Sequence, residues 1–248
     1  MLFIAPPARP QVGAHVPLDE DEFHHAVKVL RLREGARVPA LDGAGGRYEL
    51  AVERVERRSI ELVLGALPTH EPAPGEPGAP LPRIELAVAW PKDARGEDML
   101  GRLVQHGVAR IRPLLTERTG AERRAGRRAR LERLMKEHLK QCGRAWLPVL
   151  DEPASLEAVL AELADTLPAP AIHLDPRAAG SLATALAEDE GQPSAGLLVG
   201  PEGGWSPAEE ALLEAAGTRS ARLGPHVLRI ETAAEAAAAF AATLLARS

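Results

Sequence analysis

The sequence has little cysteine, few aromatic residues and no long apolar run. Its 248 residues include a single cysteine, Cys142, so no disulfide can form within the chain, which fits a reducing compartment. We expect this cysteine to be a small residue of the core. No apolar run approaches the ~20 residues that span a bilayer, and the N-terminus lacks the basic and long apolar segments of a secretory signal. We therefore expect a cytoplasmic protein with no membrane partner.

Low aromatic content and a negative charge limit how the chain can meet nucleic acid. Aromatic residues make up 3% of the chain, which argues against a broad platform for stacking bases. The net charge of −5 argues against indiscriminate coating of nucleic acid, because such proteins are basic over the whole domain. One local exception is the arginine-rich stretch 118–133, whose pattern fits either a solvated helix face or a basic patch.

Several common chemical motifs are missing as well. The eight histidines are scattered, no HExxH or CxxC pattern occurs, and the carboxylates do not cluster at ligand spacing, so we expect no metal site. Neither the GxxxxGK[ST] loop of nucleoside triphosphatases nor the GxGxxG loop of dinucleotide-binding proteins is present. A site for a triphosphate or a dinucleotide is therefore not predicted.

The first third of the chain is predicted to be rich in β-structure. Asp19 can cap a short helix, with Glu22 at the reciprocal capping position. Strands are expected at 37–41, 48–55 and 59–64, where short apolar runs alternate with turn residues. A helix followed by closely spaced short strands suggests a small β-barrel of the kind that binds oligonucleotides.

A proline- and glycine-rich stretch separates this region from the rest of the chain. Residues 67–82 contain almost nothing that could be buried, and such a composition marks a linker. We therefore expect a barrel domain at 1–70, a linker at 71–82 and a second domain at 83–248.

The second domain alternates strands with helices. Apolar runs predict strands at 84–89, 109–115, 171–174, 197–199 and 222–223. The predicted helices lie at 97–105, 127–141, 155–163, 181–187, from Ser206 onward and at 232–246. Ser206, Pro207 and Glu209 supply a cap, a first-turn proline and a capping-box glutamate. Such alternation predicts an α/β fold with a parallel sheet covered by helices on both faces.

Two loops of this domain are the candidates for ligand binding. Gly200–Gly204 (GPEGG) directly follows a predicted strand, and Leu223–Thr232 (LGPHVLRIET) lies between a short strand and the last helix. Ligands of open α/β sheets bind at the carboxyl ends of the strands. Glycine lets the backbone approach a ligand closely, and Glu202 would repel phosphate, so an adenosine pocket is favoured. The alternative for GPEGG is a tight strand–helix turn without a ligand.

These two segments resemble the C-terminal motifs of the RsmE family, the bacterial methyltransferases that act on N3 of a uridine in small-subunit ribosomal RNA. Further motifs with the same resemblance lie along nearly the whole chain. They are His24/His25 with Val29-Leu30-Arg31, Pro91-Lys92, Thr116-Glu117-Arg118, and Gln141 with Arg144 and Pro148.

The resemblance implies a two-domain enzyme. Its parts would be an N-terminal PUA-like RNA-binding barrel and a C-terminal domain of the SPOUT class with a trefoil knot, working as a homodimer. The implied cofactor is S-adenosyl-L-methionine, and the implied substrate is a uridine of 16S ribosomal RNA or of the small ribosomal subunit. We expect the cofactor to be bound by Leu174, Val199, Gly200, Pro201, Glu202, Gly203, Gly204, Leu223, Gly224, Val227 and Leu228.

Catalysis requires loss of the proton on uracil N3 and stabilisation of the resulting anion. Arg229 is the first candidate for anion stabilisation because its fork of donors suits the uracil oxygens. Glu231 or Glu202 could accept the proton. The alternative for Arg229 and Glu231 is a structural ion pair that shapes the loop. The candidates for RNA binding are His24, Lys28, Arg31, Lys92, Arg118, Gln141 and Arg144.

Two other functions are compatible with the sequence. The chain could be a non-catalytic RNA-binding factor of ribosome assembly with a vestigial adenosine pocket, although its intact glycines and LRxET segment argue against decay. It could also be a SPOUT methyltransferase that modifies another base or a ribose hydroxyl. Binding of S-adenosylmethionine separates the first alternative from an enzyme.

Overall fold

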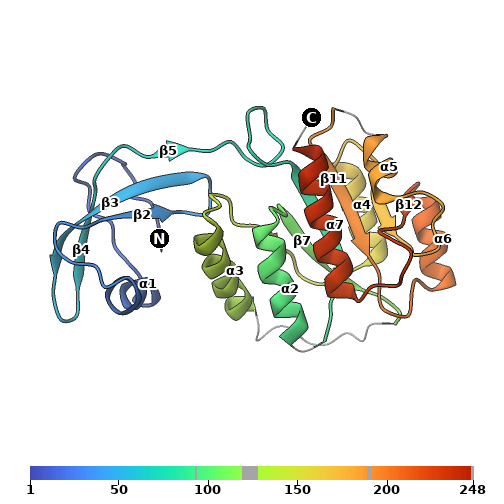
Figure 1. Ribbon diagram of the computed structural model, residues 1–248, viewed down its shortest axis with the longest axis horizontal. Helices are drawn as coiled ribbons and strands as arrows, with labels where there is room; N and C mark the ends of the chain where they lie inside the picture. Colours follow the sequence, from blue (N-terminus) through green and yellow to red (C-terminus); the bar gives the residue numbers. More distant parts are fainter. Residues whose placement is uncertain (93, 119–127, 189–190, 247–248) are drawn as a thin grey trace. The chain divides into compact units, whose positions relative to one another are not determined.

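The chain folds into two compact units (Figure 1). The computed structural model describes residues 1–92, 94–118, 128–188 and 191–246. One unit contains Met1–Ala73 together with Lys136–Leu147, and the other contains Pro74–Met135 together with Pro148–Ser248. No helix in the described part of the chain combines the length and apolar character that crossing a bilayer requires.

The N-terminal unit is built on a five-stranded sheet with the order β1-β2-β3-β4, in which β5 pairs with β3. Its strands are β1 (Leu2–Phe3), β2 (Arg37–Leu41), β3 (Gly46–Val55), β4 (Ile60–Leu64) and β5 (Thr69–His70). Alternate apolar residues of these strands, such as Leu50, Val52, Leu62 and Leu64, are buried in one cluster. The three strands predicted from the sequence are confirmed, with small changes at their ends.

A short helix precedes the main strands, and its cap is only partly as predicted. Helix α1 (Glu20–His24) begins after Asp19, whose side chain accepts a hydrogen bond from the Glu22 amide at 2.8 Å. The reciprocal capping bond from Glu22 is absent. Its buried carboxylate instead accepts from the Phe3 amide at 3.0 Å and forms an ion pair with Lys140. The ion pair with Lys140, which is distant in sequence, thus takes the place of the expected capping bond of Glu22. One π-helical turn, η1 (His25–Val29), follows.

The segment Lys136–Leu147 packs with this unit, although the sequence analysis placed it in the second domain. Arg47 donates to the Gly143 carbonyl at 2.9 Å, and the Trp146 indole donates to the Glu71 carbonyl at 3.0 Å. Cys142 lies on this segment and is exposed, so its prediction as a core residue was wrong. It ends helix α3 (Arg128–Cys142), and its thiol donates to the Leu139 carbonyl of the preceding turn at 3.6 Å.

The second unit contains a parallel sheet of seven strands with the order β12-β10-β11-β6-β7-β8, in which β9 pairs with β7. Its strands are β6 (Arg83–Ala89), β7 (Arg110–Leu115), β8 (Val149–Leu150), β9 (Ala154–Ser155), β10 (Ile172–Leu174), β11 (Ser194–Val199) and β12 (Arg219–Ala221). The helices, besides α3, are α2 (Ala94–Gln105), α4 (Leu156–Thr166), α5 (Leu182–Ala187), α6 (Pro207–Ala215) and α7 (Ile230–Leu245). Strands β6 and β11 are buried almost throughout and mostly apolar because both faces of a parallel sheet are covered.

The predicted α/β fold is confirmed, with one strand misplaced. The strand predicted at 222–223 is found at Arg219–Ala221, where it pairs with β10. Arg222 forms only an isolated bridge with Ser181, and Leu223 lines a pocket instead of extending the sheet. Residue 127, where a helix was predicted to begin, and the arginine-rich residues 119–127 lie outside the described residues.

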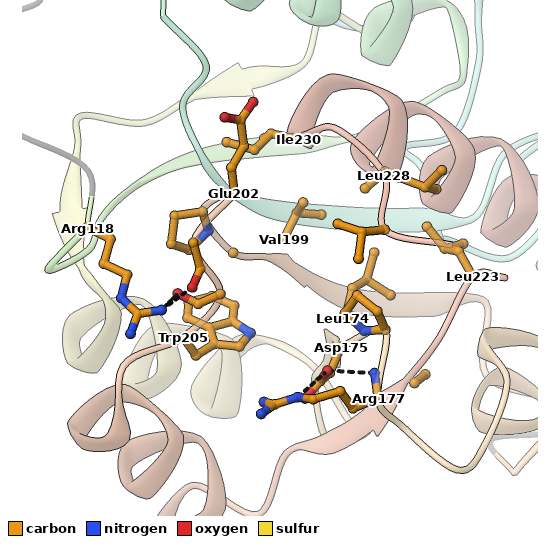
Figure 2. A pocket seen from close by; sticks show the side chains of 18 of the residues that line it. Arg118, Leu174, Asp175, Arg177, Val199, Glu202, Trp205, Leu223, Leu228 and Ile230 are labelled. Carbon is orange, nitrogen blue, oxygen red and sulfur yellow. Dashed lines mark hydrogen bonds and ion pairs between the residues drawn. The ribbon is translucent and has the colours of Figure 1, made fainter. Parts of the chain in front are cut away.

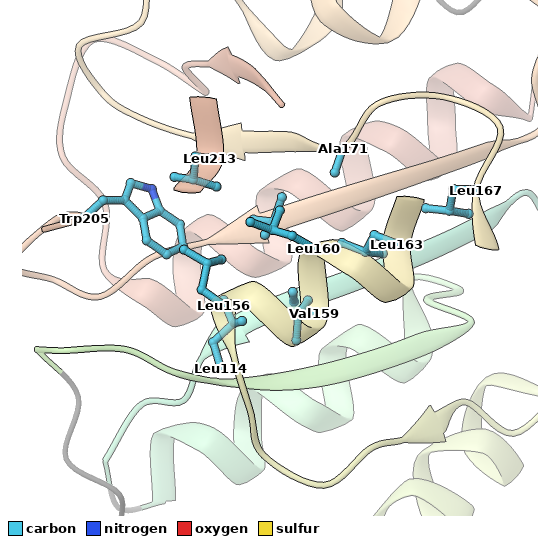
Figure 3. Close-up of a cluster of buried hydrophobic side chains, with 11 residues drawn as sticks. Leu114, Leu156, Val159, Leu160, Leu163, Leu167, Ala171, Trp205 and Leu213 are labelled. Carbon is cyan, nitrogen blue, oxygen red and sulfur yellow. The ribbon is translucent and has the colours of Figure 1, made fainter. Parts of the chain in front are cut away.

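Helices α4 and α6 pack on one another and on the sheet through a buried apolar cluster (Figure 3). Leu156, Val159, Leu160 and Leu163 of α4 lie at helical spacing and face this cluster. Leu213 of α6 is also part of it. So is Trp205, which stands in the loop just before α6, so the core reaches the segment that follows β11.

Helix α6 offers a matched test of this core. Leu213 is 1% exposed and its neighbour Leu212 is 37% exposed. Replacing Leu213 by Ala should reduce the free energy of unfolding by about 2 to 5 kcal/mol because it leaves a cavity. Leu212→Ala removes the same atoms from the surface and should change it by less than about 1 kcal/mol. Urea denaturation followed by circular dichroism measures both, and equal losses would contradict the described packing.

Candidate functional site

The candidate site is a pocket of about 520 Å³ at the carboxyl ends of β10, β11 and β12 (Figure 2). It is lined by Arg118, Leu174, Asp175, Pro176, Arg177, Val199, Gly200, Pro201, Glu202, Gly203, Gly204, Trp205, Pro207, Glu210, Ala221, Leu223, Gly224, His226, Val227, Leu228, Ile230 and Ala233. Every residue that the sequence analysis assigned to cofactor binding is in this lining. The loops 200–204 and 223–228, distant in sequence, thus face one cavity.

The loop 200–204 packs so tightly that glycine is required in it. A β-carbon on Gly200 would lie 2.7 Å from Cε2 of the Trp205 indole, well inside van der Waals contact. Gly204 has φ +74° and donates to the Pro201 carbonyl at 2.8 Å, which closes a tight turn. Trp205 therefore supports the loop from the core side and contributes its ring to the pocket.

The same loop is braced by the segment that follows β7. Arg118 donates to the carbonyl oxygens of Gly203 and of Gly204, the latter at 3.2 Å. The neighbouring Glu117 amide donates to Glu209 at 3.0 Å, and Glu209 also completes the predicted capping box with Ser206. These contacts attach the start of α6 and the glycine loop (residues 200–204) to the end of β7.

A second wall is formed by residues just after β10. The Asp175 carboxylate accepts a hydrogen bond from the Arg177 amide at 2.8 Å and pairs with the Arg177 guanidinium at 2.9 Å. Arg177 also bonds Glu210 of α6 at 2.7 Å. The hydrogen bond from the Arg177 side chain holds the pKa of Asp175 below its ordinary value, so this acid is ionised at neutral pH. Figure 2 shows Asp175 across the pocket from Trp205.

The third wall is the loop 223–228, which leads into α7. Its apolar residues Val227 and Leu228 line the pocket but stay exposed, Val227 to 75%. Arg229 is the N-cap of α7, is exposed, and does not line the pocket. Among the interactions found in the described residues, none joins its guanidinium to Glu231. The ion pair between Arg229 and Glu231, which was the structural alternative to a catalytic role, is therefore absent from this conformation.

The two candidate proton acceptors are instead held by an arginine that the sequence analysis did not consider. Nη1 of Arg95, in the first turn of α2, lies 3.3 Å from Oε1 of Glu202 and 3.6 Å from Oε1 of Glu231. Glu202 is exposed, whereas Glu231 is largely covered, with its Oε2 atom buried and without a hydrogen-bond partner in the described structure. The guanidinium of Arg95 therefore contacts both carboxylates.

The predicted RNA-binding residues are distributed over both units. His24, Lys28, Arg31 and Gln141 are exposed on the N-terminal unit, and Arg31 has φ +51°, a strained value for a residue with a side chain. Lys92 is exposed just after β6 in the other unit, where Arg118 is bonded to the glycine loop. Arg144 is buried, and burial lowers its pKa to about 10, so it is not presented for a phosphate contact.

Several residues that line or adjoin the pocket were missed, and only some had a signal in the sequence. Asp175 and Arg177 follow a predicted strand, so the rule that ligands bind at strand ends could have included them. Trp205 directly follows the GPEGG segment. Arg95 has no local signal, because only the packing of α2 brings it to the two acids. No group of three or more metal-ligating side chains is found in the described ranges.

Comparison with known proteins matches both units. A family model for the RNA methyltransferase domain matches residues 78–242, and one for the RNA methyltransferase PUA domain matches residues 18–65. Ribosomal RNA small subunit methyltransferase E of Mycobacterium bovis is 32% identical over 251 residues, covering 96% of this chain and 90% of that protein.

Two solved structures are similar over almost their whole length. The ribosomal RNA small subunit methyltransferase E of Neisseria gonorrhoeae, bound to S-adenosyl methionine, is 27% identical, with a TM-score of 0.80 and 98% of each chain covered. A methyltransferase from Legionella pneumophila in complex with SAM is 26% identical, with a TM-score of 0.82 and coverage of 98% of this chain and 97% of that one. This chain is therefore a member of the ribosomal RNA small subunit methyltransferase E family of RNA methyltransferases.

Proposed function

We propose that the protein transfers a methyl group from S-adenosyl-L-methionine to N3 of a uridine in small-subunit (16S) ribosomal RNA. The observation that carries this proposal is the convergence of the segments 200–204 and 223–228 on one pocket at the carboxyl edge of the parallel sheet. Family membership supports the reaction class and the type of RNA. The choice of uracil N3 rests on the resemblance of the motifs at both ends of the chain to those of the RsmE family.

The pocket has the properties that an adenosine-containing cofactor requires. Its volume of about 520 Å³ is within the ~300–1,000 Å³ range of small-molecule sites. The Nε1 atom of Trp205 is buried and has no hydrogen-bond partner in the described structure, so it is a donor that a ligand could satisfy. The glycine loop and the loop 223–228 would hold the adenosine. When bound, this cofactor supplies a methyl group activated by its sulfonium.

The chain's own residues would then act on uracil. The N3–H bond must break, its proton must go to a carboxylate oxygen, and its electron pair must stay on N3 to receive the methyl group. Glu202 or Glu231 accepts the proton, and both stand beside Arg95. Arg229 is exposed and uncommitted to an acid in the described structure, so its guanidinium is available to stabilise the negative charge on the uracil oxygens.

The remaining assignments belong to the same proposal. Residues 1–70 form the PUA-like RNA-binding domain, 71–82 the linker and 83–248 the SPOUT domain, whose chain passes through a trefoil knot and lends residues 136–147 to the N-terminal unit. The RNA is contacted by the exposed residues His24, Lys28, Arg31, Lys92 and Gln141, mostly at its phosphates. Phosphate contacts position the substrate without specifying its sequence. We further propose that the enzyme is a homodimer, needs no metal, and works in the cytoplasm, where its ribosomal substrate is assembled.

Cofactor binding is tested with two glycine variants. Gly200→Ala places a β-carbon against the Trp205 indole, so it should displace the loop and weaken binding of S-adenosylmethionine at least tenfold. Gly180→Ala adds the same atom where nothing lies within 4 Å and should bind like the wild type. Isothermal titration calorimetry measures both. Absence of binding heat with the wild-type protein would favour the assembly-factor alternative.

Removal of Arg229 tests the catalytic assignment. Arg229→Ala should lower turnover by about 100-fold or more, the effect typical of losing one donor to a developing anion, with cofactor affinity unchanged. Arg229→Lys keeps the charge but loses the planar fork, so it should retain part of the activity. Single-turnover methylation of small subunits purified from a deletion strain provides the rates. Methylation close to wild type in Arg229→Ala would refute this role.

The substrate is tested in cells. Mass mapping of ribosomal RNA from cells that lack this protein should show one small-subunit uridine without its N3 methyl group. A plasmid encoding the wild-type protein should restore the modification, whereas one encoding Arg229→Ala should not. Loss of a ribose methyl group, or of a methyl group on another base, would instead identify a different SPOUT activity.

A further inference from the structure

Arg95 occupies a position that the fold fixes closely. It lies in the first turn of α2, next to Gly96, which is buried against the indole of Trp90 at the end of β6. A β-carbon on Gly96 would lie 2.1 Å from the Trp90 Nε1 atom, so the helix can approach this closely only because residue 96 has no side chain. The backbone that carries Arg95 is therefore set by the packing of α2 on the end of β6.

From this position Arg95 reaches both segments that form the pocket. Its Nη1 atom lies 3.3 Å from Glu202 of the glycine loop and 3.6 Å from Glu231 at the start of α7. Figure 2 shows the Glu202 side chain extending away from Trp205, on the opposite side of its loop. The glycine loop and α7 are thus joined through the side chain of Arg95, which belongs to neither of them.

The charges explain why such a residue is needed. Without the guanidinium, two carboxylates would face each other across a short distance and repel, which would drive the two segments apart. With it, one cation serves two anions, and the Oε1 atom of each acid has a defined direction. Arg95 is only partly exposed and Glu231 still less, so water screens this contact less than it would at the open surface.

We propose that Arg95 is a positioning residue: by holding Glu202 and Glu231 on one guanidinium, it fixes the glycine loop relative to the start of α7 and orients the acid that accepts the uracil proton. The second half of this inference rests on the proposed function, whereas the first half concerns the protein alone. Arg95 contacts the acids and not the reacting atoms, so its removal should affect the rate of methyl transfer more than the binding of RNA.

The matched control is another arginine of the same helix. Arg102 of α2 pairs with Glu235 of α7 at 2.8 Å, so Arg102→Gln also removes an ion pair between α2 and α7, but one that does not include Glu202, the acid that lines the pocket. Arg95→Gln and Arg102→Gln remove the same group at two points along one helix pair. Arg95→Lys keeps a cation that can reach at least one of the acids.

Hydrogen–deuterium exchange of the protein without cofactor provides the readout that does not depend on activity. Arg95→Gln should speed exchange at least fivefold in peptides covering 200–204 and 228–233, whereas Arg102→Gln should leave them within twofold of wild type. Equal exchange in all three proteins, or the same increase in both variants, would overturn the positioning role. This outcome is independent of whether the chain methylates uridine.

Single-turnover methylation tests the second half of the inference, that Arg95 orients the acid that accepts the uracil proton. Arg95→Gln should lower the rate at least tenfold, with the apparent affinity for RNA within threefold of wild type, and Arg95→Lys should recover part of the loss. In the exchange measurement, replacement of both acids, Glu202→Gln with Glu231→Gln, should make the further change Arg95→Gln nearly silent, because the guanidinium has lost its partners. A rate unaffected by Arg95→Gln alone would refute the second half, while an inactive wild-type protein would refute the proposed function instead.

Discussion

The contact between Trp205 and Gly200 is the constraint on which the pocket depends. The indole is part of the apolar cluster formed by α4, α6 and the sheet, and it also lies against the loop that leaves β11. Because the ring leaves no room for a β-carbon at position 200, the loop can follow only a narrow path over it. The wall of the pocket formed by residues 200–204 is therefore determined by the packing of the core, and ordering this loop on binding has little entropic cost.

Three arginines add further contacts around the pocket, and each of them joins two groups. Arg118 bonds two carbonyl oxygens of the glycine loop, Arg177 joins Asp175 to Glu210, and Arg95 joins Glu202 to Glu231. A guanidinium suits this task because its donors are fixed in a plane and its charge is permanent. The acidic side chains around the pocket are thereby kept in place, and the carbonyl groups of a loop rich in glycine gain partners that its own short turn does not supply.

Much of the fold and of the pocket could be predicted because the relevant signals are local. The strands β6 and β11 are buried almost throughout and consist mostly of apolar residues, Ser206 with Glu209 marks the start of α6, and the glycines at 200–204 mark a strand-end loop. Two features could not be predicted, since each depends on a distant partner: Glu22 exchanges its expected capping bond for Lys140, and Arg95 contacts two acids from other elements. The exposure of Cys142 at the end of α3 has no signal in the sequence either, because a lone cysteine fits a core or a surface position.

The packing of Lys136–Leu147 with the N-terminal unit has a consequence for biosynthesis. This unit is discontinuous in the chain, because it needs the buried Leu139, the Lys140 partner of Glu22 and the Trp146 donor to Glu71, all of which follow β6, α2 and β7. While the chain emerges from the ribosome, the N-terminal unit can be completed only after the first strands of the other unit have been synthesised. Neither unit can then be obtained by a single cut of the gene, and a faithful isolated version of the first would require grafting residues 136–147 onto it.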